Sequence, residues 1–151
     1  DDDVVVNLQG DEPFVDFRDI NNIADLLNDK TIDMATLYAD LKVEDVINPN
    51  VVKIWTRAND QVINFSRKED KVSDVKFTRS QHLGIYAYRV KFLKEFINWK
   101  QTDNEKMESL EQLRALERGK NIYAKKSIAK IHLGIDTPED LHLAQKLLEN
   151  D

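Results

Sequence analysis

The feature of the sequence that most constrains the fold is a short apolar run close to its start. Val4–Leu8 is continuously hydrophobic apart from one amide, and does not alternate between apolar and polar residues. A strand of that kind is typical of a sheet with both faces covered. We therefore expect Val4–Leu8 to be a fully buried strand.

Further strand-like and helix-like segments alternate along the chain. The other predicted strands are Met34–Ala39, Val51–Thr56, Val62–Phe65, Leu83–Tyr88 and one or two edge strands within Ile122–Ile131. The predicted helices are Ile20–Asn28, Val90–Trp99, Glu105–Glu117 and Pro138 to about Asn150. Strands mixed with helices predict an α/β or α+β sandwich around a mixed sheet. The 151 residues suffice for one domain, 1–151, and are too few for two ordinary ones.

Capping residues predict where the helices begin and end. Asp19 is expected to cap the first helix. Thr137 is expected to cap the last, with Asp140 as the acid of a capping box. Gly119 is a good stop for the third helix. The residues expected on the buried faces of the two middle helices are Phe92, Leu93, Phe96, Ile97, Met107, Leu110, Leu113 and Leu116.

Composition excludes several classes of protein. A net charge of -6 argues against a nucleic-acid-binding surface. Because the chain has no cysteine, neither a disulfide framework nor a thiolate zinc site is available to it. No apolar run approaches the length that spans a bilayer, and no signal-peptide pattern is present. These features fit a cytoplasmic protein without a membrane partner.

Two aspartates lie next to predicted elements: Asp11 follows a strand, and Asp136 precedes a helix. Asp11 comes after Gly10 at the end of the first strand, where ligands collect in open α/β sheets. An ordinary turn with a solvated carboxylate explains this position equally well. Asp136 lies just ahead of the Thr137 cap, so its carboxylate is not needed for capping. Two such carboxylates at neighbouring rims of a sheet suit one Mg²⁺.

Three other places offer polar groups to a ligand. His82, Tyr86 and Tyr88 alternate and share one face of a strand, which fits either a sugar site or the ordinary solvent side of a sheet, and we favour the latter. Glu111 and Gln112 provide acceptors and an amide donor that suit hydroxyl groups, on what is normally a solvated helix face. Arg67 is either a surface charge or a clamp for a carboxylate.

Taken in order, six blocks of the sequence resemble those of one enzyme family. The blocks are NLQGDEP, NPNVVK, FSR, HLGIYAYR, ESLEQLRALE and GIDTPEDL. They resemble successive blocks of the 3-deoxy-manno-octulosonate (Kdo) cytidylyltransferases, also called CMP-Kdo synthetases. The resemblance runs from Val4 to about Leu148, and it implies a three-layer α/β sandwich like that of nucleotide-diphospho-sugar transferases.

The resemblance also implies an activity and a set of site residues. The activity is transfer of CMP from CTP to Kdo, with release of pyrophosphate and with Mg²⁺, for lipopolysaccharide biosynthesis. By this analogy Asp11 and Asp136 are catalytic and bind the metal. The residues implied to bind the sugar are Gln9, Arg67, His82, Tyr86, Glu111 and Gln112. The family usually forms homodimers.

The sequence departs from the family pattern in two respects. The N-terminal part, which carries a PARxxSxRxPGK-type basic loop for CTP, has no counterpart here, so we expect the C-terminal two-thirds of a longer protein. After FSR the chain continues with the charged segment KEDKVSD in place of an apolar, proline-containing one. Two alternatives therefore stay open: a catalytically incompetent fragment acting as a dimerising or sugar-binding module, and a cytidylyltransferase for a related acidic sugar such as 8-amino-Kdo.

Overall fold

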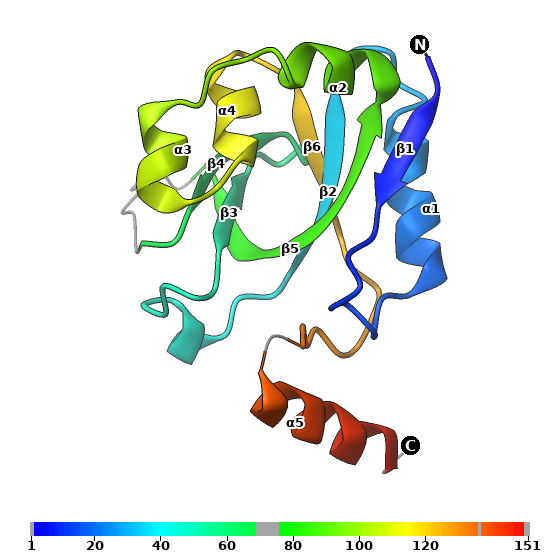
Figure 1. Cartoon of the computed structure of the whole chain (residues 1–151), viewed down its shortest axis with the longest axis vertical. Helices are drawn as coiled ribbons and strands as arrows, with labels where there is room; N and C mark the ends of the chain where they lie inside the picture. Colours follow the sequence, from blue (N-terminus) through cyan, green and yellow to red (C-terminus); the bar gives the residue numbers. More distant parts are fainter. Residues whose placement is uncertain (1, 69–75, 136, 150–151) are drawn as a thin grey trace.

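The protein folds around one mixed six-stranded sheet (Figure 1). The computed structural model describes residues 2–68, 76–135 and 137–149. The strands are β1 (Val4–Asn7), β2 (Met34–Ala39), β3 (Lys53–Thr56), β4 (Val62–Ser66), β5 (Thr78–Arg89) and β6 (Ile122–Lys126). Their order is β4-β3-β5-β2-β6, with β1 also paired to β5. Only β2 and β6 pair in parallel among the described strands, so the predicted mixed sheet is confirmed.

Strand β5 is the centre of the sheet because both of its edges are occupied. Strand β2 pairs with one edge along residues 81–88. On the opposite edge, β3 pairs with residues 78–81 and β1 pairs with residues 86–89. The register of β2 shifts between Thr36 and Leu37, opposite Gly84 and Ile85. The sheet therefore forks along β5, and the fork separates β1 from β3 (Figure 1).

The outer strands β4 and β6 approach each other, which curls the sheet. The Ala124 N–H donates to the Asp60 carbonyl at 3.0 Å, and Gln61 forms a bridge with Tyr123. The concave side of the curled sheet encloses one hydrophobic core, which includes Ile54 and Ile122. Both side chains are fully buried.

Helices cover the two faces of the sheet. Helix α1 (Phe17–Leu26) packs on the face that carries Leu37 and Ile85, where it buries Ile23. The opposite face is covered by α2 (Val90–Phe96), α3 (Asp103–Glu108) and α4 (Gln112–Glu117). A short 3₁₀ helix, η1, spans Val43–Asp45, and α5 spans Pro138–Glu149. Helix α5 stands apart from the sheet, as Figure 1 shows.

Alternating side chains of β5 pack into two hydrophobic cores, one on each face of the sheet. Leu83, Ile85 and Ala87 point toward α1. Tyr86 and Tyr88 point toward α2 and α4, in the other core. The polar face that we favoured as the solvent side of the sheet is therefore buried, because α2 and α4 cover it.

Several local predictions were wrong. Val4 and Val5 are 39% and 42% exposed, because among the described strands β1 pairs only with β5 and lies at an edge. Asp16, not Asp19, caps α1 by accepting a hydrogen bond from the Arg18 N–H at 2.8 Å. Asp19 is fully buried instead, and its carboxylate accepts hydrogen bonds from Ser127 Oγ at 2.6 Å and Ile128 N–H at 3.0 Å.

The predicted helix Glu105–Glu117 is broken into α3 and α4. Ser109 ends α3 in the left-handed conformation, with φ of 54°. A capping box between Thr102 and Glu105 begins α3 two residues earlier than expected. Met107 on α3 is exposed rather than buried, and so is Ile97 just after α2. The Thr137–Asp140 capping box and the positive φ of Gly119 (72°) agree with the predictions.

Within the part of the chain that the structure describes, no helix is both long enough and apolar enough to cross a membrane.

The break at Ser109 predicts an unusual response to glycine. The left-handed conformation costs an L-residue about 1–2 kcal/mol, a cost that glycine avoids. We expect Ser109→Gly to raise the free energy of unfolding, measured by urea denaturation, by up to about 1 kcal/mol. Ser109→Ala should give no increase. In a continuous helix the order would be reversed, with glycine lowering stability by about 1 kcal/mol.

Candidate functional site

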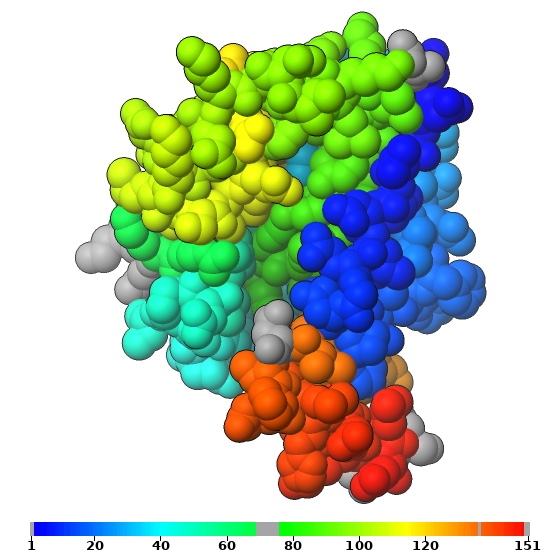
Figure 2. All heavy atoms as spheres, in the orientation of Figure 1, coloured from blue at the N-terminus to red at the C-terminus, as the bar shows by residue number. Residues whose placement is uncertain are grey.

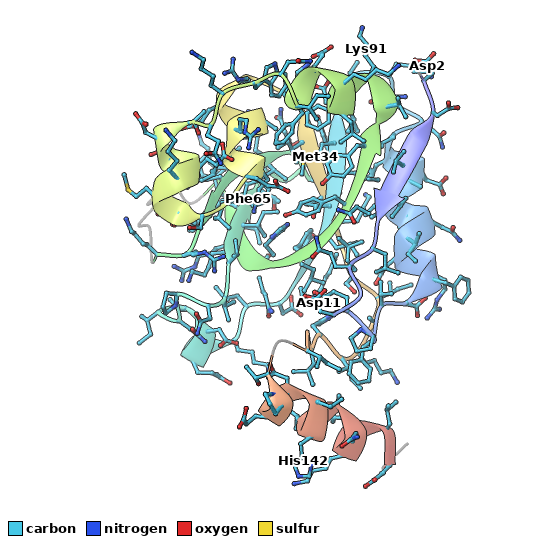
Figure 3. The ribbon with its side chains drawn as sticks, in the orientation of Figure 1. Asp2, Asp11, Met34, Phe65, Lys91 and His142 are labelled. Carbon is cyan, nitrogen blue, oxygen red and sulfur yellow. The ribbon has the colours of Figure 1, made fainter. Side chains whose placement is uncertain are left out.

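A pocket opens beside the fork of the sheet, between β1, the end of β5 and the helices α2 and α4. Its volume is about 340 Å³. The surface is visibly hollowed between β1, in blue, and the yellow end of α3 and α4 in Figure 2. The lining residues are Val5, Val6, Asn7, Met34, Tyr86, Tyr88, Phe92, Leu93, Phe96, Glu111 and Gln112. Most of the lining is apolar, and Figure 3 shows Met34 within the body of the molecule.

Three of the residues predicted to bind sugar converge on this pocket. Tyr86 comes from β5, whereas Glu111 and Gln112 come from the start of α4. Gln112 is only 4% exposed, and its side-chain amide has no hydrogen-bond partner among the described residues. The Tyr86 hydroxyl likewise makes no hydrogen bond with a described residue. No fully buried side-chain nitrogen or oxygen among the described residues lacks a hydrogen-bond partner, so these two groups open onto the pocket, where a ligand can reach them.

The tyrosines of the pocket stay uncharged. Burial raises the pKa values of Tyr86 and Tyr88 well above their usual range, and the negative charge of Glu111 raises both further. A hydrogen bond from the Asn7 side chain partly offsets this effect on the pKa of Tyr88. Both hydroxyls therefore act as neutral donors and acceptors.

His82 lies directly behind Tyr86 and not among the lining residues. The two ring centroids are 5.5 Å apart. The Thr36 hydroxyl lies 3.1 and 2.8 Å from the carbonyls of Leu83 and Ile85, so its proton is committed to them. Its oxygen, 3.0 Å from His82 Nε2, therefore accepts from a protonated Nε2. Burial lowers the pKa of His82 to about 3, and the ring is neutral at physiological pH.

Arg67 is held by backbone carbonyls and lies outside the lining of the pocket. Its Nε donates to the Glu108 carbonyl at 2.9 Å, and one terminal nitrogen donates to the Pro49 carbonyl at 3.2 Å. The Glu108 carboxylate accepts a hydrogen bond from the Arg67 N–H at 2.8 Å. The fully buried Lys53 donates to the Arg67 carbonyl at 2.6 Å. Arg67 thus connects the end of β4 to the corner between α3 and α4.

Asp11 lies in the loop after β1, between the sheet and α5 in the view of Figure 3. Its carboxylate is partly exposed and takes no hydrogen bond or ion pair from any described residue. The Ile135 N–H donates to the Asp11 carbonyl at 2.8 Å, so the segment that precedes position 136 is bonded to Asp11. Asp136 itself lies outside the described residues. Gln9 is exposed and is not part of the pocket lining.

The described residues contain no group of three or more carboxylate or imidazole side chains that would form a metal site on its own. This is compatible with Mg²⁺, which needs only one or two carboxylates when phosphate oxygens and waters complete its shell. A partly exposed Asp11 carboxylate without a protein partner fits such a ligand.

Sequence reasoning missed part of the pocket. Asn7 pairs with Tyr86 across β1 and β5, and Met34 pairs with Tyr88 across β2 and β5. Tyr88 was noticed as part of the alternating face but was not predicted to bind a ligand. Strand register brings these residues together, and no single segment of the sequence reveals it.

A mixed sheet between helical layers, with a pocket beside its central strand, defines an α/β protein of the nucleotidyltransferase type. Its fold is shared with a putative glucose-1-phosphate thymidylyltransferase from Bacillus anthracis, at a TM-score of 0.62 and 18% identity, over 99% of this chain and 56% of the other. The chain belongs to the cytidylyltransferase family, whose profile matches residues 1–122. The predicted fold class is thereby confirmed.

Several similar proteins of known name are 3-deoxy-manno-octulosonate cytidylyltransferases. 3-Deoxy-manno-octulosonate cytidylyltransferase 2 of Actinobacillus pleuropneumoniae is 38% identical over 99% of this chain and 64% of that protein. The enzyme of Idiomarina loihiensis is 41% identical over 96% of this chain and 62% of that protein. A solved structure of CMP:2-keto-3-deoxy-manno-octonic acid synthetase complexed with CTP superimposes with a TM-score of 0.86 at 30% identity, over 98% of this chain and 62% of the other. The chain thus spans somewhat under two thirds of these relatives.

The buried neutral His82 predicts a loss of stability in acid. Histidine in the unfolded chain takes up a proton near pH 6.5, whereas His82 in the folded protein does so only near pH 3. The stabilising contribution is therefore complete above pH 6.5 and declines as the pH falls below it. From pH 7 to pH 5, His82 alone should lower the free energy of unfolding by about 2 kcal/mol.

Urea denaturation at both pH values measures this effect. His82→Gln should be less stable at pH 7 but should show a pH difference smaller by about 2 kcal/mol. The matched control is His142→Gln, because His142 is exposed on α5, and it should keep the difference of the unmodified protein. An unchanged difference in His82→Gln would show that the buried ring already accepts a proton above pH 5.

Proposed function

We propose that this protein transfers CMP from CTP to the eight-carbon sugar acid 3-deoxy-manno-octulosonate, giving CMP-Kdo and pyrophosphate for lipopolysaccharide biosynthesis. The observation that carries the proposal is the convergence of Tyr86, Glu111 and Gln112 on one pocket. These residues come from two separate blocks of the resemblance, and each was expected to bind the sugar. Membership in the cytidylyltransferase family and the names of the relatives support the same activity.

We also propose that Asp11 and Asp136 hold Mg²⁺. Support comes from the Asp11 carboxylate, which has no partner among the described residues, and from the hydrogen bond that ties Ile135 to Asp11. Bound there, Mg²⁺ would reduce the negative charge on the phosphate oxygens of CTP.

The residues of this chain contribute orientation more than covalent chemistry. In the proposed reaction the anomeric hydroxyl of the sugar attacks the α-phosphorus, pyrophosphate departs, and the hydroxyl proton is lost to solvent. Gln112 and Tyr86 hold the sugar through groups that no described residue occupies. His82, neutral and hydrogen-bonded to Thr36, supports the Tyr86 ring from behind. Such preorganisation accounts for much of the acceleration in phosphoryl and nucleotidyl transfer.

The cellular setting is proposed as well. CTP is made in the cytoplasm, so we place the protein there. We propose a homodimer, as the family resemblance implies.

A second candidate is a sugar-binding module without transferase activity. All the residues that line the pocket belong to this chain, which spans under two thirds of its relatives. The chain could therefore bind a sugar without the rest of the protein. Two measurements separate the candidates: Kdo binding by titration calorimetry, and pyrophosphate release with CTP, Kdo and Mg²⁺. Binding with release supports the transferase, and binding without release supports the module. Absence of both would contradict the two functions together.

The metal proposal predicts the effect of neutralising either aspartate. Asp11→Asn and Asp136→Asn should each lower the rate of pyrophosphate release by about 100-fold or more, because one metal ligand is lost from the transition state. The circular dichroism spectrum should not change. Asp40→Asn is the matched control, since Asp40 is exposed and pairs only with Lys126 at 2.7 Å, and it should keep the full rate. Equal rates in all three variants would remove the magnesium role from this pair.

A further inference from the structure

The charge of the pocket restricts which part of a sugar acid can enter it. Among the described lining residues Glu111 is the one that carries a charge, and none is a lysine, arginine or histidine. The nearest cation on the same helix, Arg114, is already engaged: its Nε donates to a Glu105 carboxylate oxygen at 2.8 Å and a second nitrogen bonds the other oxygen. Outside the lining, the Arg114 guanidinium lies 4.3 Å from the Phe96 ring centroid and interacts with Glu111, but the described lining itself carries one negative charge and no positive one.

A carboxylate would be disfavoured in these surroundings. The walls are formed largely by apolar side chains such as Met34 and Phe92, both at most 3% exposed. A second carboxylate brought beside Glu111 in an apolar pocket would lose its hydration and repel a like charge.

Hydroxyl groups, in contrast, find several partners there. The buried Gln112 amide provides donors and an acceptor, and the Tyr86 hydroxyl provides one of each. Tyr88 and Asn7 provide a further pair at the β1 side of the pocket, where their side chains are hydrogen-bonded to each other. Apolar and aromatic walls suit the C–H faces between the hydroxyls of a sugar.

We infer that the pocket receives the uncharged, hydroxyl-bearing end of the sugar acid, that its carboxylate stays outside, and that Tyr88 with Asn7 is a further specificity-determining pair. This inference rests on the proposed function. It also gives Glu111 a defined effect: it accepts a hydrogen bond from a hydroxyl, and it would favour an ammonium group at the same place on the sugar.

Titration calorimetry of the 151-residue chain with Kdo tests the inference. We expect Tyr88→Phe and, independently, Asn7→Ala to weaken Kdo binding about fivefold, the effect of one lost hydrogen bond. The loss should largely disappear for an analogue shortened by the terminal CHOH groups. Tyr123→Phe is the matched control, because Tyr123 lies on β6 and does not line the pocket, and it should bind as the unmodified chain does.

The sign of the Glu111→Gln effect decides the orientation. With hydroxyls beside Glu111, this variant should bind Kdo somewhat more weakly, and it should lose any preference for an analogue with an amine at the tail end. Glu44→Gln, on η1, removes the same charge far from the pocket lining and should change neither affinity.

Two results would overturn the inference, and they can be distinguished. Tighter Kdo binding by Glu111→Gln, with no such gain for the Kdo carboxamide, would place the carboxylate inside the pocket and leave the proposed function intact. Failure of the unmodified chain to bind Kdo, with or without CTP and Mg²⁺, would refute the proposed function and the inference with it.

Discussion

The pairing of β5 on both edges is the constraint on which the rest of the structure depends. A 12-residue strand holds β2 on one side and both β3 and β1 on the other. Its alternating side chains then supply two cores, one under α1 and one under α2 and α4. The fork between β1 and β3 leaves room for the pocket. Tyr86 and Tyr88 line it because they lie on the β1-paired part of β5 and point to the concave side of the sheet.

The same constraint explains why polar residues are buried at the centre of the molecule. The register shift at Thr36 displaces ladder hydrogen bonds, and its hydroxyl satisfies the carbonyls of Leu83 and Ile85 while it accepts from His82. His82 then lies between the Phe65 ring, 5.0 Å away between centroids, and Tyr86. A rigid stack of rings therefore fixes the orientation of the one pocket tyrosine whose hydroxyl has no described partner.

The sequence predicted the elements better than it predicted their surroundings. Met34–Ala39 was found with its observed bounds, because a run of apolar residues between turns is a local signal. The left-handed Ser109 was missed, since the apolar spacing of residues 107–116 continues across it. In the folded chain the Glu108 carboxylate, next to the break, accepts hydrogen bonds from Ser66 and Arg67, contacts that the local sequence does not reveal. The pocket was half predicted: Tyr86, Glu111 and Gln112 were noticed as polar groups suited to a ligand and were assigned to the sugar by the family resemblance, whereas Asn7 depends on strand register.

The two parts of the proposed site differ in what holds them. The pocket proposed for the sugar is built from strands and helices whose side chains are packed, so its polar groups are held in place before a ligand binds. The acidic part rests on loops: Asp11 follows β1 by four residues, and its neighbour in space, Ile135, is joined to it by a backbone hydrogen bond. A backbone bond does not fix a side chain, so the direction of the Asp11 carboxylate depends on its own loop. If both proposals hold, sugar affinity depends on the packed pocket and metal binding depends on the Asp11 loop, so substitutions in one part should leave the function of the other part intact.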